Sequence, residues 1–314
     1  MLKSIHPTVD DNVKPWAGRS RGGQPLSFNR APSQDLIPWL SRISATPVDL
    51  PADYQLHSGL FNDCPMVRIQ LTGDYQMHAI DGVQHHRASA LVFGPHSRFM
   101  PISVTGSFNS VGMALRPGAA YALFGVDTAH LVDRIVPFEA VGLDSAQVLD
   151  RLGQIQDPAG WVEFLERSFR RLVQSRGSPL PDPVTTAFEL LSYADPTAQI
   201  GEFAEEVGIS MRQLQRIIRR DFGMAPKQVL RRARALDMAS HLRGVADEKE
   251  AEDLVLRYFD QAQMTREFTE LFSMTPRQFM KTPNPILTLT LEARQAHRLV
   301  ELKRLPPGAT RPWQ

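Results

Sequence analysis

The chain of 314 residues has little of several features that define common protein classes. Its single cysteine, Cys64, excludes an internal disulfide framework, a zinc site built from several cysteines and a paired-thiol redox motif. No stretch approaches the roughly 18 uncharged apolar residues that a membrane-spanning helix needs, and residues 1–10 lack the apolar core of a signal peptide. The sequence therefore predicts a cytoplasmic protein without a membrane partner.

The motifs of the commonest enzyme chemistries are also missing. There is no Gly-x-Ser-x-Gly nucleophile elbow, no P-loop and no dinucleotide-binding glycine fingerprint. Cys64 lies in Asn-Asp-Cys-Pro, which supplies no base or metal ligand to activate its thiol. The adjacent His85 and His86 would point to opposite faces of a strand, so they are poorly placed to share one metal ion. We expect no catalytic residue, no cofactor and no metal site.

Positive charge is balanced overall but concentrated in one segment. The chain has 35 Lys and Arg against 34 Asp and Glu, which gives a net charge of +1. Between Ile209 and Arg234 there are eight basic residues and one acidic residue, a local balance of +7. This is the steepest charge feature of the chain, and it marks a candidate surface for nucleic acid.

The pattern of apolar residues changes from strand-like to helical along the chain. Residues 55–116 contain short alternating runs, such as Met66 to Leu71, that are separated by turn signals such as Gly94-Pro95. This spacing is typical of a small β-barrel or sandwich. Helical periodicity follows, first in an apolar stripe that we interpret as a bracket or a dimerisation element: Trp161, Phe164, Leu165 and Phe169.

Together these patterns predict an α+β fold. Four prolines and three glycines within the first 32 residues indicate a mobile N-terminal segment. Three prolines between Arg176 and Pro183 indicate a linker. The predicted segments are a mobile basic arm at 1–34, a β-barrel or cupin-like regulatory and dimerisation domain with flanking helices at 35–176, a Pro-rich linker at 177–183, an all-α domain of two helix-turn-helix units joined by a linker helix at 184–282, and a partly disordered C-terminal extension at 283–314.

The helical half contains an internal repeat with an offset of fifty residues. Phe222-Gly-Met-Ala-Pro-Lys-Gln-Val229 and Phe272-Ser-Met-Thr-Pro-Arg-Gln-Phe279 match in residue type at nearly every position. A helix that begins at about Pro226 and ends near Arg243 would join the two copies. Two copies of one supersecondary unit are therefore expected.

The first copy has the plan of a helix-turn-helix unit. Gly208 suits a tight turn, and Ser210 with Gln213 forms a capping box that begins a new helix. The apolar residues of this helix lie on one face and leave the polar residues on the other side: Arg212, Gln215, Arg216, Arg219 and Arg220. Arg suits guanine O6 and N7, Gln suits adenine N6 and N7, and the last two arginines are better placed for phosphates.

The second copy has fewer basic residues. Asp260 is the expected cap of its outer helix, which presents Gln261, Ala262, Gln263 and Arg266 outward. From Ala235 to Thr282 there are six basic and nine acidic residues, so we expect weaker phosphate binding than in the first copy.

Residues 200–281 resemble the DNA-binding domain of AraC/XylS-type transcription regulators. The most specific match, Phe259 to Pro276, is similar to the signature that precedes the final helix of that domain. The resemblance implies base reading in two sets, Arg212, Gln215 and Arg216 in the first helix and Gln261, Ala262, Gln263 and Arg266 in the second. Arg257 and Tyr258 stand where the family usually has glycine, which is a departure in the second turn.

The resemblance also implies partners. It implies a sequence-specific regulator that binds double-stranded DNA, contacts RNA polymerase, and uses its N-terminal domain to bind a small effector or to form a homodimer. No ligand-binding residue can be assigned from the sequence. Two other interpretations stay open: a cupin-type metal enzyme with an accessory DNA-binding module, and a protein-interaction module that has lost DNA binding.

Overall fold

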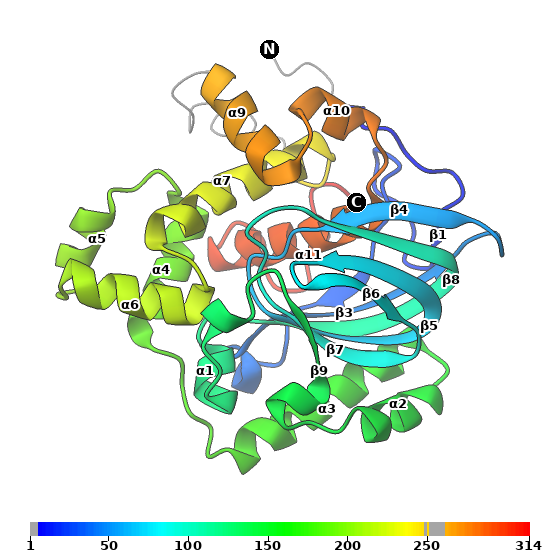
Figure 1. Cartoon of the computed structure of the whole chain (residues 1–314), viewed down its shortest axis with the longest axis horizontal. Helices are drawn as coiled ribbons and strands as arrows, with labels where there is room; N and C mark the ends of the chain where they lie inside the picture. The colour runs from blue at the N-terminus through cyan, green and yellow to red at the C-terminus, as the bar shows by residue number, and fades with distance from the viewer. Residues whose placement is uncertain (1–5, 248–249, 251–260) are drawn as a thin grey trace.

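Nine strands form one antiparallel sheet in the N-terminal half of the chain (Figure 1). The computed structural model describes residues 6–247, 250 and 261–314. The strand order is β1-β3-β8-β5-β7-β9, with β2 on β3, β4 on β8 and β6 on β5. The strands are β1 Lys14–Pro15, β2 Phe28–Arg30, β3 Leu40–Asp49, β4 Gln55–Leu60, β5 Met66–Ala79, β6 Gly82–His86, β7 Ser89–Phe93, β8 Met100–Leu115 and β9 Ile135–Pro137.

One α-helix lies between β8 and β9 and two follow β9 before the Pro-rich segment, and the last of them corrects a prediction. They are α1 Ala119–Phe124, α2 Ser145–Gly153 and α3 Pro158–Ser175. Trp161, Leu165 and Phe169 of α3 are buried in the same core as Ile43 of β3 and Val111 of β8. The sheet itself therefore covers this stripe. Burying each large apolar side chain contributes about 1.5–3 kcal/mol to stability. The bracket interpretation of α3 is confirmed, and the stripe is not available for dimerisation.

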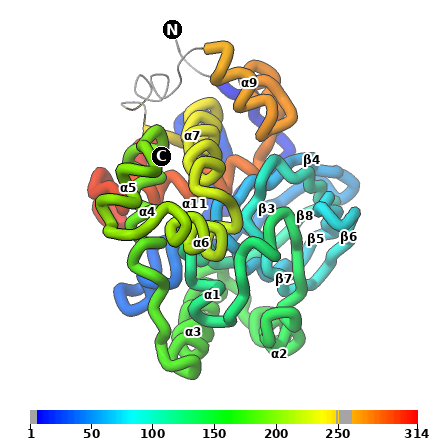
Figure 2. Tube along the Cα trace, turned by 60° about the vertical axis from the view of Figure 1, so that its left-hand side comes forward, coloured from blue at the N-terminus to red at the C-terminus, as the bar shows by residue number. Residues whose placement is uncertain are grey.

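The C-terminal half consists of helices and contains the predicted repeat. The described helices are α4 Pro183–Ala194, α5 Ile200–Glu206, α6 Met211–Phe222, α7 Pro226–Leu242, α9 Gln261–Phe272, α10 Pro276–Lys281 and α11 Pro285–Glu301. The predicted joining helix is confirmed as α7. Its 17 residues span roughly 25 Å at about 1.5 Å per residue. Figure 2 shows α6 beside α1 and α9 beyond the other end of α7.

The predicted mobile arm at 1–34 is wrong for the residues that the structure describes. Val13 and Leu26 are buried, β1 and β2 pair with β3, and the backbone N–H of Thr8 donates to the carbonyl of Met280 at 2.8 Å. The prolines and glycines that suggested mobility shape turns instead, since Gly18 and Gly23 have φ of 84° and 76°. The arm is therefore part of the folded body.

The predicted loose C-terminal extension is also wrong. Helix α11 lies between the sheet and α7, and Leu287 and Leu291 are buried in the core that α7 and α9 share (Figure 1). Near the end of the chain, Trp313 is 4% exposed and its indole Nε1 donates to Glu292 of α11 at 3.1 Å. The last residues therefore help to anchor α11. No described helix is long and apolar enough to cross a membrane.

Candidate DNA-binding surface

The local sequence builds α6 as a capped helix. The backbone N–H of Ser210 donates to Gln213 Oε1 at 3.0 Å, and the backbone N–H of Gln213 donates to Ser210 Oγ at 3.3 Å, which confirms the predicted capping box. Gly208, with φ of 71°, makes the turn between α5 and α6. At the other end, Gly223 adopts φ of 80°, and a Cβ there would lie 2.5 Å from Val132 Cγ2. Glycine is thus required at this end.

One face of α6 is buried and the opposite face is polar and exposed. Leu214, Ile218 and Phe222 pack in the helical core. The exposed residues at helical spacing i, i+3, i+4 and i+7 are Arg212, Gln215, Arg216 and Arg219. We call these four residues the α6 stripe. Three guanidinium groups and one amide along one exposed helix face can donate to phosphates and to base edges in a major groove.

Arg220 differs from the stripe, because its side chain is engaged within the fold, and its phosphate role stays a prediction. Its guanidinium donates to both carboxylate oxygens of Asp221, at 2.6 and 2.7 Å, and its carbon lies 4.2 Å from the ring centroid of Tyr121 in α1. The hydrogen bonds to Asp221 raise the pKa of Arg220. Asp221 is fully buried, so its charge needs this partner. Arg220 therefore stabilises the fold.

Other members of the basic segment also have internal partners. Arg232 of α7 is buried and donates to the carbonyls of Asp63 and His96. Arg231 and Arg234 pair with Glu267 of α9, at 3.3 and 3.1 Å. The local balance of +7 in the sequence therefore overstates the charge that the surface offers to DNA.

The second predicted set lies on α9, partly in a groove. Gln261, Ala262 and Arg266 are exposed, and Gln263 is half-buried. Gln263 and Arg266 line a groove of about 780 Å³ together with the start of α5 and with α7, and no member of the α6 stripe lines it. The structure thus does not bring the two predicted sets together. The predicted cap Asp260 and the departures Arg257 and Tyr258 lie outside the described residues.

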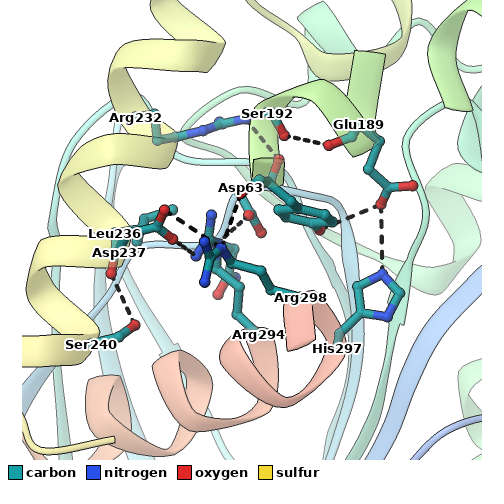
Figure 3. A network of polar contacts seen from close by, with 12 residues as sticks. Asp63, Glu189, Ser192, Arg232, Leu236, Asp237, Ser240, Arg294, His297 and Arg298 are labelled. Carbon is teal, nitrogen blue, oxygen red and sulfur yellow. Dashed lines mark hydrogen bonds and ion pairs between the residues drawn. The ribbon is translucent and has the colours of Figure 1, made fainter. Parts of the chain in front are cut away.

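A buried ionic network, which sequence reasoning missed, joins α11 to the rest of the chain (Figure 3). Arg294 Nε lies 2.6 Å from Asp63 Oδ2, and its Nη1 lies 2.7 Å from Asp237 Oδ1 of α7. Arg116 Nη2 lies 2.5 Å from Glu189 Oε2 of α4. Burial disfavours the Glu189 carboxylate, but Arg116 and His297 hold its pKa below the ordinary value.

The sequence offers three candidates for redox or metal chemistry, namely Cys64, His85 and His86. Burial raises the pKa of the Cys64 thiol well above its usual value, which disfavours the reactive thiolate. His85 and His86 belong to β6, where they lie opposite Gln76 and Tyr75 of β5. Among residues 6–247, 250 and 261–314, no group of three His, Cys, Asp or Glu side chains could hold a metal ion.

Comparison with protein families gives two matches. Residues 203–282 match a family described as a helix-turn-helix domain, and residues 29–137 match a domain of unknown function (DUF6597). The first match covers α6, α7, α9 and α10. A search of curated proteins found no match.

Solved structures share only a weak likeness with the chain. ToxT from Vibrio cholerae is 10% identical, with a TM-score of 0.43 over 76% of this chain and 97% of ToxT. A ToxT structure with bound unsaturated fatty acid is 11% identical, with a TM-score of 0.42 over 76% and 94%. The AraC-like transcriptional activator CuxR is 15% identical, with a TM-score of 0.28 over 67% and 86%. Likenesses at this level carry no argument about function.

The helix-turn-helix match and the geometry of α5, α6 and α7 define the class of the protein. The chain is a DNA-binding transcription regulator of the helix-turn-helix class. More particularly, its C-terminal region contains a helix-turn-helix domain of the AraC type at residues 203–282.

Proposed function

We propose that the chain recognises a specific DNA sequence chiefly through the α6 stripe, with Arg212, Gln215 and Arg216 at base edges and Arg219 at phosphates. The observation that carries this proposal is the stripe itself. It presents three arginines and a glutamine on one exposed face of a helix whose ends are fixed by a capping box and a glycine. The residues of α9, namely Gln261, Ala262, Gln263 and Arg266, have the smaller role in this proposal.

The proposal extends to partners that the family resemblance implies. The regulator acts in the cytoplasm, contacts RNA polymerase at its promoter, and responds to a small effector through its N-terminal half. A homodimer would need a surface other than the α3 stripe. The tip of the β5–β6 hairpin offers one, because Ile80 and Val83 are 57% and 49% exposed. Sedimentation of the Ile80→Ser, Val83→Ser double variant against the unchanged chain tests this surface.

The test of sequence recognition is selection from random duplexes with the full chain, followed by binding curves at several salt concentrations. We expect the selected duplex to bind about a thousandfold or more tightly than a scrambled duplex of equal length. Affinity for both duplexes should fall as salt rises, because phosphate contacts release counterions. Equal affinity for the two duplexes would contradict sequence recognition, and no affinity for either would favour the protein-interaction interpretation.

A further inference from the structure

One face of the sheet is polar although it is covered. Along β3 the side chains alternate, so that Ile43 and Ala45 face the α3 core while Arg42, Ser44 and Thr46 face the other way. The register extends this polar face across the sheet. Arg42 lies opposite Ala114 of β8, which lies opposite Met66 of β5; Ser44 lies opposite Gly112, which lies opposite Arg68. A purely structural sheet would be expected to bury apolar side chains on such a face.

Helix α11 covers this polar face and leaves a chamber beneath it. The chamber has a volume of about 60 Å³. Its walls are polar residues of the strands on one side, among them Arg42, Ser44 and Arg68, and Thr290, Arg294 and His297 of α11 on the other. A water molecule occupies a sphere of about 10–15 Å³, so the chamber has room for a small ligand and not for a bulky one.

The chamber has an excess of positive charge. Asp63 is the one acidic residue among the described residues that line it, and it is already paired with Arg294. The hydrogen bonds of Arg42 go to the uncharged Asn29, and its buried Nε has no partner in the described part of the chain. Burial lowers the pKa of Arg42 to about 9.

Of the two arginines on this face of the sheet, Arg68 has fewer polar partners. Within the described ranges it has no hydrogen bond and no ion pair, and its guanidinium carbon lies 5.6 Å from the ring centroid of Phe93. Burial lowers the pKa of Arg68 as well. Arg42 is buried and Arg68 is half-buried, and two such cations without a counter-ion among the described residues are costly to keep unless a ligand supplies the negative charge.

We propose that the chamber between the polar sheet face and α11 binds a small organic anion, whose carboxylate is held by Arg42 and Arg68. The small volume of the chamber favours a ligand of few non-hydrogen atoms. A guanidinium group matches a carboxylate in shape and can donate two parallel hydrogen bonds to it. The site deepens the effector control proposed above and rests on it for its regulatory meaning.

The position of Arg294 gives the site a route to the DNA-binding helices. Arg294 lines the chamber and also pairs with Asp237 of α7, the helix that joins the two helix-turn-helix units (Figure 3). A carboxylate in the chamber competes with Asp63 and Asp237 for this guanidinium. Occupancy therefore changes the contacts of α7, and ligand and DNA must alter each other's affinity by the same factor.

The test uses the full chain, first without DNA. Calorimetry and thermal unfolding are measured with acetate, propionate and butyrate, with the matching amides acetamide, propionamide and butyramide, and with inorganic phosphate. We expect at least one carboxylate to bind and to raise the melting temperature, and its amide to bind at least about tenfold more weakly. No response to any carboxylate, equal binding of acid and amide, or tighter binding of phosphate would each overturn the proposal.

Variants separate ligand binding from folding. Arg68→Met should raise the melting temperature of the free protein, because it removes a half-buried cation that has no ion pair among the described residues, and weaken carboxylate binding by at least about tenfold. Arg42→Gln should weaken binding as well, with circular dichroism to confirm the fold. Arg167→Gln changes an exposed arginine of α3 and should leave binding unchanged. Unchanged carboxylate affinity in Arg68→Met would overturn the site, whatever the outcome of the DNA experiments.

The regulatory meaning is tested last, by binding curves on the selected duplex with and without the tightest-binding carboxylate. We expect the carboxylate to change DNA affinity at least about fivefold in the unchanged chain and not in Arg68→Met. An equal affinity with and without the carboxylate would overturn the regulatory meaning while leaving the binding site standing. Failure of DNA binding itself would appear already in the absence of the carboxylate.

Discussion

The two helix-turn-helix units share a backbone plan and differ in the faces that they expose. After α6, Gly223 has φ of 80°, and after α9 the equivalent Ser273 has φ of 57°. Each turn is followed by the same capping contact, from the backbone N–H of Ala225 to Gln228 Oε1 at 3.1 Å and from that of Thr275 to Gln278 Oε1 at 2.9 Å. The repeated segment of sequence thus encodes the turn and the start of the next helix.

The outer helices of the two units have diverged. Helix α6 contains four arginines and one aspartate, whereas α9 contains one arginine and two glutamates. The fifty-residue offset places Ala262, Thr265, Arg266 and Thr269 where the α6 stripe has Arg212, Gln215, Arg216 and Arg219. The hydroxyls of Thr265 and Thr269 donate to backbone carbonyls of α9, at 2.9 and 2.6 Å. The second unit therefore keeps the scaffold, but its outer helix α9 offers one long cationic side chain for DNA.

The largest loss of stability should come from replacing Arg220, whose side chain pairs with Asp221 inside the first unit. Arg220→Ala leaves the buried Asp221 carboxylate without its cation, and we expect the free energy of unfolding to fall by about 2–4 kcal/mol, somewhat less than for a fully buried pair because Arg220 is 20% exposed. Denaturant unfolding measures the loss. The neighbour Arg219→Ala, an exposed member of the stripe, is the control and should change stability little. Equal stability of the two variants would contradict the internal role of Arg220.

The turn residues give a reciprocal comparison. Gly223→Ser copies the residue of the second unit into the first and should lower the free energy of unfolding by about 1–3 kcal/mol, because the new Cβ meets Val132. Ser273→Gly makes the opposite exchange and relieves a left-handed serine, so it should be close to neutral. Thermal and denaturant unfolding of both variants check this. A neutral Gly223→Ser would show that α6 does not pack against the N-terminal half as described.

Base reading by the second unit should be the weaker of the two. Arg266→Ala is expected to reduce affinity for the selected duplex by less than about 1 kcal/mol, because the groove beside α7 already places Glu267 and Glu270 near this arginine. Binding curves on selected and scrambled duplexes measure the change. A loss of affinity equal to that of Arg216→Ala would mean that α6 and α9 contribute equally to recognition, which would contradict this prediction.

The smallest effect should follow from the acidic face of α9. Glu270 pairs with Arg231 of α7, with Oε2 and Nη2 2.5 Å apart; the Glu270 side chain is exposed and that of Arg231 is half-buried. Glu270→Gln leaves Arg231 with Glu267 as its one ion-pair partner among the described residues, so it should raise affinity for random DNA slightly and steepen the slope of log K against log salt by less than about one unit. Glu163→Gln, an exposed change on α3, is the control. An unchanged slope would mean that Arg231 stays away from DNA.

The sequence predicts those parts of the structure that local chemistry decides. The capping box at Ser210, the helix from Pro226 and the repeat follow from short-range rules, and the structure contains all three. Long-range packing decides the rest. Alternation could not reveal that α11 covers the sheet, or that Arg220 and Arg232 turn inward, because a charged residue looks the same in sequence whether its partner is water or a buried carboxylate. Arg294 and Arg298, which lie four residues apart and therefore on one face of a helix, were the available signal.

The central claim, that α6 reads bases, is tested most directly by Arg216→Ala on the selected duplex, on its single-base-pair variants and on a scrambled duplex. Arg219→Ala is the matched control, since it removes the same charge from the same face. The account predicts that Arg216→Ala loses about 1–3 kcal/mol on the selected duplex, loses preference at one base pair and changes little on scrambled DNA, whereas Arg219→Ala weakens all duplexes similarly. Equal losses for Arg216→Ala on every duplex, or none on any, would contradict it.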